Sequence, residues 1–401
     1  MEGLLLGIDL CDDYSQISCF RPLNMEPEPV ALEENSSSGL IPTVICKKRG
    51  EDAWYIGEEA YRLALLGGGT MVDKLVKLVR KEGYATIEGV RYSAEDLLRI
   101  YVGKILELPV KKYGIPDVES LVFTVQELEA HFLDKLVRVG EACGVAREAV
   151  HILSHTESFI YYVISQRKDV WANQTCLLDL TEDGLHFYEM KVIRGRKPQM
   201  IEASHQKLEE GFSLDVLDNP SGEHLADTIL TACAERLFQR KLISSVFLTG
   251  KGFLATDWAS NFLKMACNKR KVFAGQHLFS GGAAYVAFDL LQEHTAYPYV
   301  CICEGRIRST VSLYAVYGGR KEQVVLAAAG SNWYEAKSSV EFILDDVNML
   351  DLTVTPVGSP RVEKVSISLD ELPARPNKTT RIEVIVSFTA ERCMTVRVVD
   401  K

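Results

Sequence analysis

Two turns of this sequence carry clustered carboxylates, and each turn follows a short apolar run. The first cluster is Asp9, Asp12 and Asp13, and the second is Asp179, Glu182 and Asp183. Carboxylate oxygens are the ligands that Mg²⁺ and Ca²⁺ take in proteins. The acidic turns either hold a divalent cation between them or are solvated residues of ordinary hairpins, and the sequence leaves both interpretations open.

Three further features could contribute to phosphate chemistry. Gly67-Gly68-Gly69-Thr70 lacks the Lys-Ser/Thr pair that a phosphate loop needs, so we interpret it as a flexible helix entry. Lys74 and Lys77 follow it and are candidates for a catalytic lysine, although lysines on a surface helix are common. His155 has no nucleophile motif such as G-x-S-x-G beside it, and we interpret it as a structural histidine at a helix start.

Hydrophobic periodicity indicates which elements position these residues. Predicted strands span residues 4–10, 14–20, 41–46, 54–57, 120–125, 150–153, 176–180, 185–193, 199–203 and 245–248. Predicted helices span residues 71–81, 93–107, 127–143, 157–166, 225–240 and 257–266, with a last helix from residue 278, and residues 26–38 are predicted to be a surface loop. Each acidic turn thus joins two strands, and the repeated order of elements predicts a duplicated α/β domain.

From about Tyr299 the pattern changes to alternation of strand length, which predicts an all-β domain. Its clearest feature is a hairpin formed by residues 381–388 and 393–398. The chain stops directly after this hairpin, which predicts that it is a piece of a longer protein. We therefore expect three domains, at residues 1–165, 166–297 and 298–401.

Composition excludes several classes of protein. The chain has 401 residues, 47% of them apolar, and a net charge of −10, which disfavours a general surface for nucleic acid or for an anionic membrane. Its densest basic cluster, Asn268-Lys269-Arg270-Lys271, is interpreted as a solvated loop. The ten cysteines lack paired metal-ligand spacing, and no apolar run approaches the length of a membrane span, so a cytoplasmic location with reduced thiols is expected.

Several motifs along the chain stand in a familiar order. They are Gly7-Ile8-Asp9-Leu10, Leu40-Ile41-Pro42-Thr43-Val44 with Tyr55-Ile56-Gly57-Glu58-Glu59-Ala60, Ser280-Gly281-Gly282-Ala283-Ala284, and residues 367–376 with 381–401. In this order the chain resembles the DnaK-type heat-shock chaperone family of the actin-like ATPase superfamily. The resemblance implies a duplicated ribonuclease-H-like fold in two lobes, the second reduced, followed by a β-sandwich that binds peptides.

The resemblance also implies a nucleotide site between the lobes, occupied by ATP or ADP with Mg²⁺. The positions that match the family's nucleotide-binding motifs are Gly7, Asp9, Asp12, Asp13, Lys74, Asp179, Thr181, Gly184, Gly250 and Gly252. Asp9 and Asp179 match its metal-side carboxylates.

The same motifs depart from the family where phosphate should bind. The family's small Gly-Thr-Thr turn is Cys11-Asp12-Asp13 here, and two carboxylates ~5 Å apart repel by roughly 3 kcal/mol at an effective dielectric constant of about 20. The second turn replaces glycines by Thr181-Glu182-Asp183, and Glu-Pro-Thr becomes His155-Thr156-Glu157. Only about twenty residues separate Ala203 from Leu225, where the family inserts the subdomain that clamps adenine.

These departures favour a chaperone-like pseudo-ATPase, a cytoplasmic scaffold whose β domain binds a protein or peptide and which binds neither nucleic acid nor membrane. An alternative hypothesis is a divergent chaperone that retains metal-dependent ATP binding and hydrolysis. A third is an actin-like protein that forms polymers.

Overall fold

The computed structural model describes residues 3–32, 39–195, 198–358 and 361–401. The chain divides into two compact units, the first made of residues 1–194 and 201–298, and the second of residues 195–200 and 299–401. The first unit is mixed α/β, and the second is rich in β-strands.

One sheet of the first unit is built around β1, in the order β11-β10-β1-β2-β3, with β4 paired to β2. Its strands are β1 (Leu4–Leu10), β2 (Tyr14–Arg21), β3 (Glu26–Val30), β4 (Ile41–Pro42), β10 (Val118–Val125) and β11 (Val150–Ser154). β1 runs antiparallel to β2 and parallel to β10, and β10 runs parallel to β11. Every residue of β1 is buried, as an apolar run in a central strand predicts.

A second sheet contains five strands of this unit in the order β16-β15-β12-β13-β14. Its strands are β12 (Gln174–Thr181), β13 (Gly184–Ile193), β14 (Gln199–Lys207), β15 (Ile243–Thr249) and β16 (Lys271–Ala274). β12 runs antiparallel to β13 and parallel to β15, and β15 runs parallel to β16. The second sheet therefore repeats the order of the first, and in both an acidic turn joins the central strand to its antiparallel neighbour.

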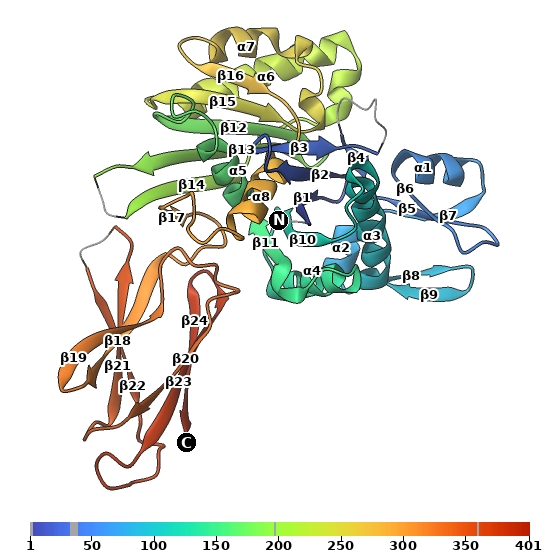
Figure 1. Ribbon diagram of the computed structural model, residues 1–401. Coiled ribbons are helices and arrows are strands. Elements are labelled where there is room, and N and C mark those ends of the chain that lie inside the picture. Colours follow the sequence, from blue (N-terminus) through green and yellow to red (C-terminus); the bar gives the residue numbers. More distant parts are fainter. Residues whose placement is uncertain (1–2, 33–38, 196–197, 359–360) are drawn as a thin grey trace. The chain divides into compact units, whose positions relative to one another are not determined.

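Two helices pack closely beside the first sheet. α5 (His155–Ile164) contacts α8 (Leu278–Asp289), and α8 also packs on β1 and β2 (Figure 1). Small residues permit this approach, because a Cβ atom at Gly282 would overlap the Ser158 carbonyl oxygen and one at Gly7 would overlap the Ser280 carbonyl oxygen.

The remaining elements of the first unit surround these two sheets. They are β5 (Ile45–Lys48), β6 (Trp54–Ile56), α1 (Gly57–Leu65), β7 (Gly69–Val72), α2 (Leu75–Arg80), β8 (Tyr84–Ile87), β9 (Val90–Ser93), α3 (Ala94–Tyr113), α4 (Ala130–Ala142), α6 (Pro220–Phe238) and α7 (Ser260–Ala266), with short 3-10 turns η1 (Arg147–Ala149), η2 (Leu214–Asp218), η3 (Lys251–Phe253) and η4 (Asp257–Ala259). Ser93, at the start of the predicted helix 93–107, caps α3, and its hydroxyl accepts the Asp96 N–H at 3.1 Å.

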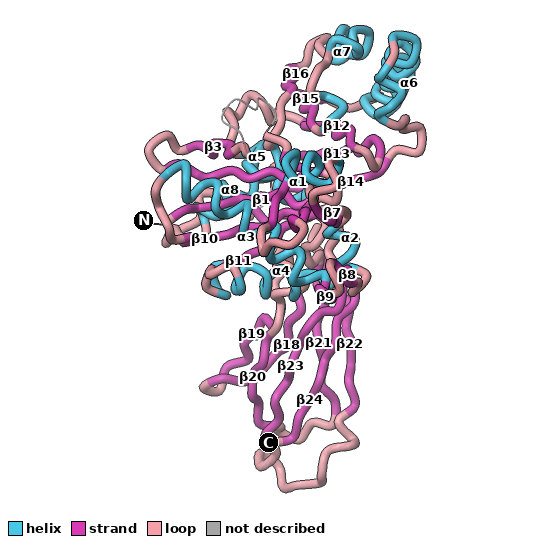
Figure 2. Tube along the Cα trace, turned by 90° about the vertical axis from the view of Figure 1, so that its right-hand side faces the viewer, coloured by secondary structure: helices cyan, strands magenta, loops and turns pink. Residues whose placement is uncertain are grey.

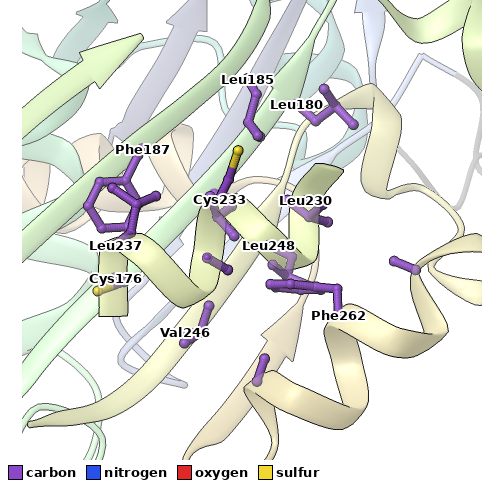
Figure 3. Packing of buried hydrophobic residues seen from close by; sticks show 14 of the residues in the cluster. Cys176, Leu180, Leu185, Phe187, Leu230, Cys233, Leu237, Val246, Leu248 and Phe262 are labelled. Carbon is purple, nitrogen blue, oxygen red and sulfur yellow. The ribbon is translucent and has the colours of Figure 1, made fainter. Parts of the chain in front are cut away.

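Helices α6 and α7 and the second sheet share an apolar core (Figure 3). Leu230, Cys233 and Leu237 of α6 and Phe262 of α7 pack with Leu180, Leu185, Val246 and Leu248 of the strands. This core stabilises the strand ends from which the second acidic turn projects.

The second unit forms two sheets, in the orders β19-β18-β21-β22 and β20-β23-β24. Their strands are β18 (Ser309–Tyr317), β19 (Arg320–Ala327), β20 (Ser338–Ile343), β21 (Met349–Pro356), β22 (Glu363–Ser368), β23 (Arg381–Ala390) and β24 (Cys393–Asp400) (Figure 2). A short strand outside these two sheets, β17 (Tyr299–Ile302), precedes them along the chain. Leu313, Leu326 and Leu352 of the first sheet share a core with Ile382, Val384 and Val386 of the second. The β23–β24 hairpin is the one that the alternation predicts.

Two predictions of local structure were wrong. Residues 26–30 form β3 instead of a loop. This strand lies at a sheet edge, where proline is tolerated because Pro27 and Pro29 need not donate a hydrogen bond to a further strand. The predicted helix 71–81 begins only at Leu75, because residues 69–72 form β7 and Lys74 takes a left-handed conformation with φ 51°. Gly69-Thr70 is therefore strand and not helix entry, and residues 33–38 of the predicted loop lie outside the described residues.

All ten cysteines are free thiols. Among the described residues, each helix is too short or too polar to span a membrane.

Candidate functional site

Both acidic turns line a cavity of about 730 Å³ in the first unit, called the crevice below. Its lining includes Asp9, Cys11, Asp12, Asp13, Lys74, Lys77, Gln126, His155, Asp179, Thr181, Glu182, Asp183, His186, Gly250, Lys251 and Phe279. These residues come together because β1, β10 and β11 run parallel, as do β12 and β15, so that their carboxyl ends meet at one edge of each sheet.

Asp9, Cys11 and His155 converge in the crevice. His155 Nε2 lies 2.7 Å from Asp9 Oδ1 and 3.8 Å from Cys11 Sγ, and Cys11 Sγ lies 3.5 Å from Asp9 Oδ1. Asp9 and His155 are 6% and 3% exposed. The ring of Phe279 stacks on the imidazole with centroids 4.1 Å apart, which fixes the orientation of that ring.

The protonation of this cluster follows from its burial. Desolvation, reinforced by the charges of Asp9 and Asp179, raises the pKa of the Cys11 thiol well above its ordinary value. Desolvation also raises the pKa of Asp179 to about 7, although His155 lowers it. Cys11 therefore keeps its proton at neutral pH, and Asp179 is partly protonated.

The carboxylates of the first turn have donors of their own. Asp12 accepts the backbone N–H of Lys77 at 2.9 Å, and Asp13 forms an ion pair with Lys74. Burial raises the pKa of Asp12 against the effect of that hydrogen bond. Since Lys74 is engaged with Asp13, the candidate catalytic lysine serves to neutralise the turn.

The second turn is neutralised in the same way. Glu182 pairs with Lys251 at 2.6 Å, and Asp183 contacts Lys207 at 2.8 Å and His186 at 3.3 Å. The Asp183 N–H donates to Thr181 Oγ1 at 3.2 Å, which closes the turn. The acidic side chains are thus held by neighbouring cations, which offsets the repulsion expected from the sequence.

The structure separates the predicted nucleotide-binding residues into two groups. Those that line the crevice are Asp9, Asp12, Asp13, Lys74, Asp179, Thr181 and Gly250. Gly7 packs against α8, Gly252 packs against Leu180, and Gly184 takes a φ of 125° at the turn. At Gly250, where φ is 89°, a Cβ atom would overlap Asp179 Oδ1.

A pair of histidines borders the second turn. His186 Nδ1 lies 3.0 Å from His205 Nε2 and 3.1 Å from Gln126 Nε2. Burial lowers the pKa of both imidazoles to about 4. The charges of Lys207 and His155 lower the pKa of His186 further while Asp183 opposes them, and the charges of His186 and His155 lower the pKa of His205 further. Both rings are therefore neutral at pH 7.

Residues 26–304 match the model described as the C-terminal part of a family of unknown function, DUF5716. This match covers more than half of the chain. The chain belongs to the DUF5716 family. Residues 306–401 match a domain of unknown function, DUF8552, and no curated protein matches the chain.

The DUF5716 match includes His155 and Asp179 of the crevice but begins after Asp9 and Cys11. In this DUF5716 chain, sequence reasoning missed the cluster formed by Cys11 and His155. The sequence by itself indicates only a replaced turn residue at Cys11 and a structural histidine at His155. The available signal was that His155 directly follows a predicted strand, residues 150–153, because residues at strand ends are often brought together at one edge of a sheet.

Proposed function

We propose that this chain is a chaperone-like pseudo-ATPase of the actin and DnaK type. It acts as a cytoplasmic scaffold that binds a protein or peptide through its C-terminal β unit, and its crevice does not turn over ATP efficiently. Ten free cysteines fit a reducing compartment. A similar fold alone does not establish a function, so the proposal depends on the residues of the crevice.

The repeated strand order supports the proposed architecture of two ribonuclease-H-like lobes. Both sheets place a central strand between an antiparallel neighbour and a parallel one, with the acidic turn at the antiparallel connection. Helix α5 begins with His155-Thr156-Glu157, which stand at the family's Glu-Pro-Thr, and α8 contains Ser280-Gly281-Gly282-Ala283-Ala284, so both motifs of the resemblance start or lie in helices, which supports the proposal.

The single observation that carries the proposal is that the protein's own carboxylates occupy the donors a phosphate would need. Asp12 takes the Lys77 N–H, Asp13 takes Lys74, and Glu182 takes Lys251. A phosphate site requires free N–H groups and cations directed at the anion. A triphosphate would have to break these contacts and face the displaced carboxylates.

The segment between β14 and α6 also favours a poor nucleotide site. Residues 208–219 contain the 3-10 turn η2, where the resembling family has a helical subdomain that clamps adenine. Binding energy from the base would therefore be reduced.

The β unit offers a surface for a partner. Register places Val325 opposite Ser312, so Val325, Tyr314 and Val316 lie on one face of the β18–β19 pair, and all three are exposed. Grouped exposed apolar side chains of this kind are typical of sites that bind protein segments.

Magnesium-dependent ATP turnover by the full chain tests the proposal. We expect turnover no faster than in a sample without protein. A rate typical of DnaK-type chaperones that Asp9→Ala abolishes would refute it.

A second candidate function is metal-dependent nucleotide binding and hydrolysis. It is favoured by the crevice volume of about 730 Å³, which lies within the range of small-molecule sites. Asp9 and Asp179 would then face Mg²⁺ and the phosphates. Millimolar ATP or ADP with Mg²⁺ would raise the melting temperature under this alternative and leave it unchanged under the first.

A further inference from the structure

We propose that Asp9, Cys11 and His155 bind one zinc-type transition-metal ion in the crevice. This site goes beyond the proposed function and does not depend on it, because it requires no nucleotide. One oxygen, one sulfur and one nitrogen ligand come from β1, from the turn after β1 and from the start of α5. The three ligand atoms all lie within 4.8 Å of one another.

The observed distances are close to those of a tetrahedral zinc centre. With Zn–O, Zn–N and Zn–S bonds of about 2.0, 2.05 and 2.3 Å, tetrahedral geometry places O and S about 3.5 Å apart, N and S about 3.6 Å, and O and N about 3.3 Å. The Asp9–Cys11 and Cys11–His155 separations are 3.5 and 3.8 Å. The Asp9–His155 separation is 2.7 Å, so this hydrogen bond must open by about 0.6 Å when the ion replaces its proton.

The donor set selects the metal. Thiolate and imidazole are ligands of Zn²⁺ and related ions, whereas Mg²⁺ demands oxygen ligands in an octahedron. On binding, the Cys11 thiol releases one proton to solvent, and the neutral imidazole carries its proton on Nδ1. Three protein ligands leave the fourth tetrahedral position to water, on the side of the crevice.

The geometry argues against a cysteine nucleophile activated by a triad. In a triad the imidazole contacts the nucleophile through one ring nitrogen and the orienting carboxylate through the other. Here Asp9 Oδ1 and Cys11 Sγ both lie next to Nε2 of His155. Convergence of three donor atoms on one point is the arrangement that a metal ion needs.

The residues around Asp9, Cys11 and His155 preorganise these side chains for binding an ion. Asp9 and His155 are buried, and Phe279 stacks on the imidazole, so little side-chain entropy remains to be lost on binding. Asp179 lies close enough to interact electrostatically with Asp9 and His155. A dication would compensate this group of desolvated carboxylates.

Cobalt titration of the full chain, stripped of metal by a chelator, tests the site. A Co²⁺ ion bound by a thiolate gives a sulfur-to-cobalt charge-transfer band, and we expect this band to saturate at one equivalent and to disappear when Zn²⁺ is added. Cys11→Ser should abolish the band, whereas Cys267→Ser, which removes an exposed thiol that does not line the crevice, should leave it unchanged.

Affinity for Zn²⁺ provides the second measurement. Loss of even an outer-shell partner costs about 10–100-fold in metal affinity, so His155→Gln and Cys11→Ser should each weaken binding by about 100-fold or more. Circular dichroism of each variant shows whether it is folded. A folded Cys11→Ser variant that keeps the band, or a wild-type chain that shows no band at all, would overturn the proposal. ATP turnover is measured separately in Mg²⁺, so failure of either proposal leaves the other standing.

Discussion

His155 Nε2 lies 2.7 Å from Asp9 Oδ1, although the two residues are 146 positions apart along the chain. The contact joins the carboxyl end of β1 to the start of α5 in a buried site. Since the carboxylate can only accept, the imidazole N–H donates. This hydrogen bond links the first acidic turn to the segment that follows β11.

Asp9→Ala should reduce stability, because it leaves a buried imidazole N–H without its acceptor. We expect a loss of about 1–3 kcal/mol in the free energy of unfolding, measured by urea denaturation with a chelator present. Asp52→Ala, at an exposed turn, should change it by less than about 0.5 kcal/mol. Equal effects of the two substitutions would contradict the importance of the contact.

Gly7→Ala tests whether this glycine serves helix packing. A Cβ atom there would overlap the backbone of Ser280 and Ala284, so we expect a loss of about 1–3 kcal/mol or more. Gly103→Ala in α3 meets only Cys143 Sγ at 3.9 Å and should stabilise by about 0.5–1 kcal/mol through helix propensity. Thermal unfolding of the two variants should therefore shift in opposite directions.

The buried His186 predicts a loss of stability in acid. Its pKa is lowered from 6.5 to about 4 by burial, so the unfolded chain binds a proton at a pH where the folded chain does not. The contribution of His186 to the free energy of unfolding is fully present above pH 6.5. It is lost as the pH falls toward 4, and the loss is about 3 kcal/mol. His186→Gln should show a shallower fall in urea midpoints across this window, and an unchanged slope would exclude His186 as the cause.

Replacing Cys11-Asp12-Asp13 by the small Gly-Thr-Thr turn of the chaperone family that the chain resembles should improve nucleotide binding. The variant Cys11→Gly with Asp12→Thr and Asp13→Thr frees the Lys77 N–H and Lys74 for a phosphate. We expect ADP with Mg²⁺ to raise its melting temperature and to leave the wild type unchanged. Glu51→Thr with Asp52→Thr makes the same change of charge at an exposed turn and should gain nothing. A response in that control would attribute the effect to net charge.

The face of β18 and β19 that exposes Tyr314, Val316 and Val325 should bind peptides. Tyr314→Ser with Val316→Ser should weaken the binding of extended apolar peptides, measured by fluorescence anisotropy, by about tenfold, which is about 1.4 kcal/mol. Ile343→Ser with Val347→Ser removes two exposed apolar side chains elsewhere in the unit and should have little effect. Peptide affinity that neither pair changes would place binding on another surface.

Local pattern by itself determined much of this protein. Alternation and apolar runs predicted the strands on either side of Asp12-Asp13 and Glu182-Asp183, and Ser93 marked the start of α3, because neighbouring residues set strand pleat and helix caps. Edge strand β3 escaped prediction, since Pro27 and Pro29 are tolerated only where no further strand pairs, and the sequence does not state which strand is last.

Only the tertiary structure decided what the individual site residues contact. Gly7 matches a nucleotide-binding motif of the family that the chain resembles, and the structure shows that it makes room for α8, because a glycine does not by itself indicate which neighbour lies against it. Cys11 and His155 meet Asp9 through the parallel pairing of β1, β10 and β11, and the salt bridges of Lys74 and Lys251 span 61 and 69 positions. Contacts between distant segments depend on sheet order and register, and these arise from packing of the whole unit.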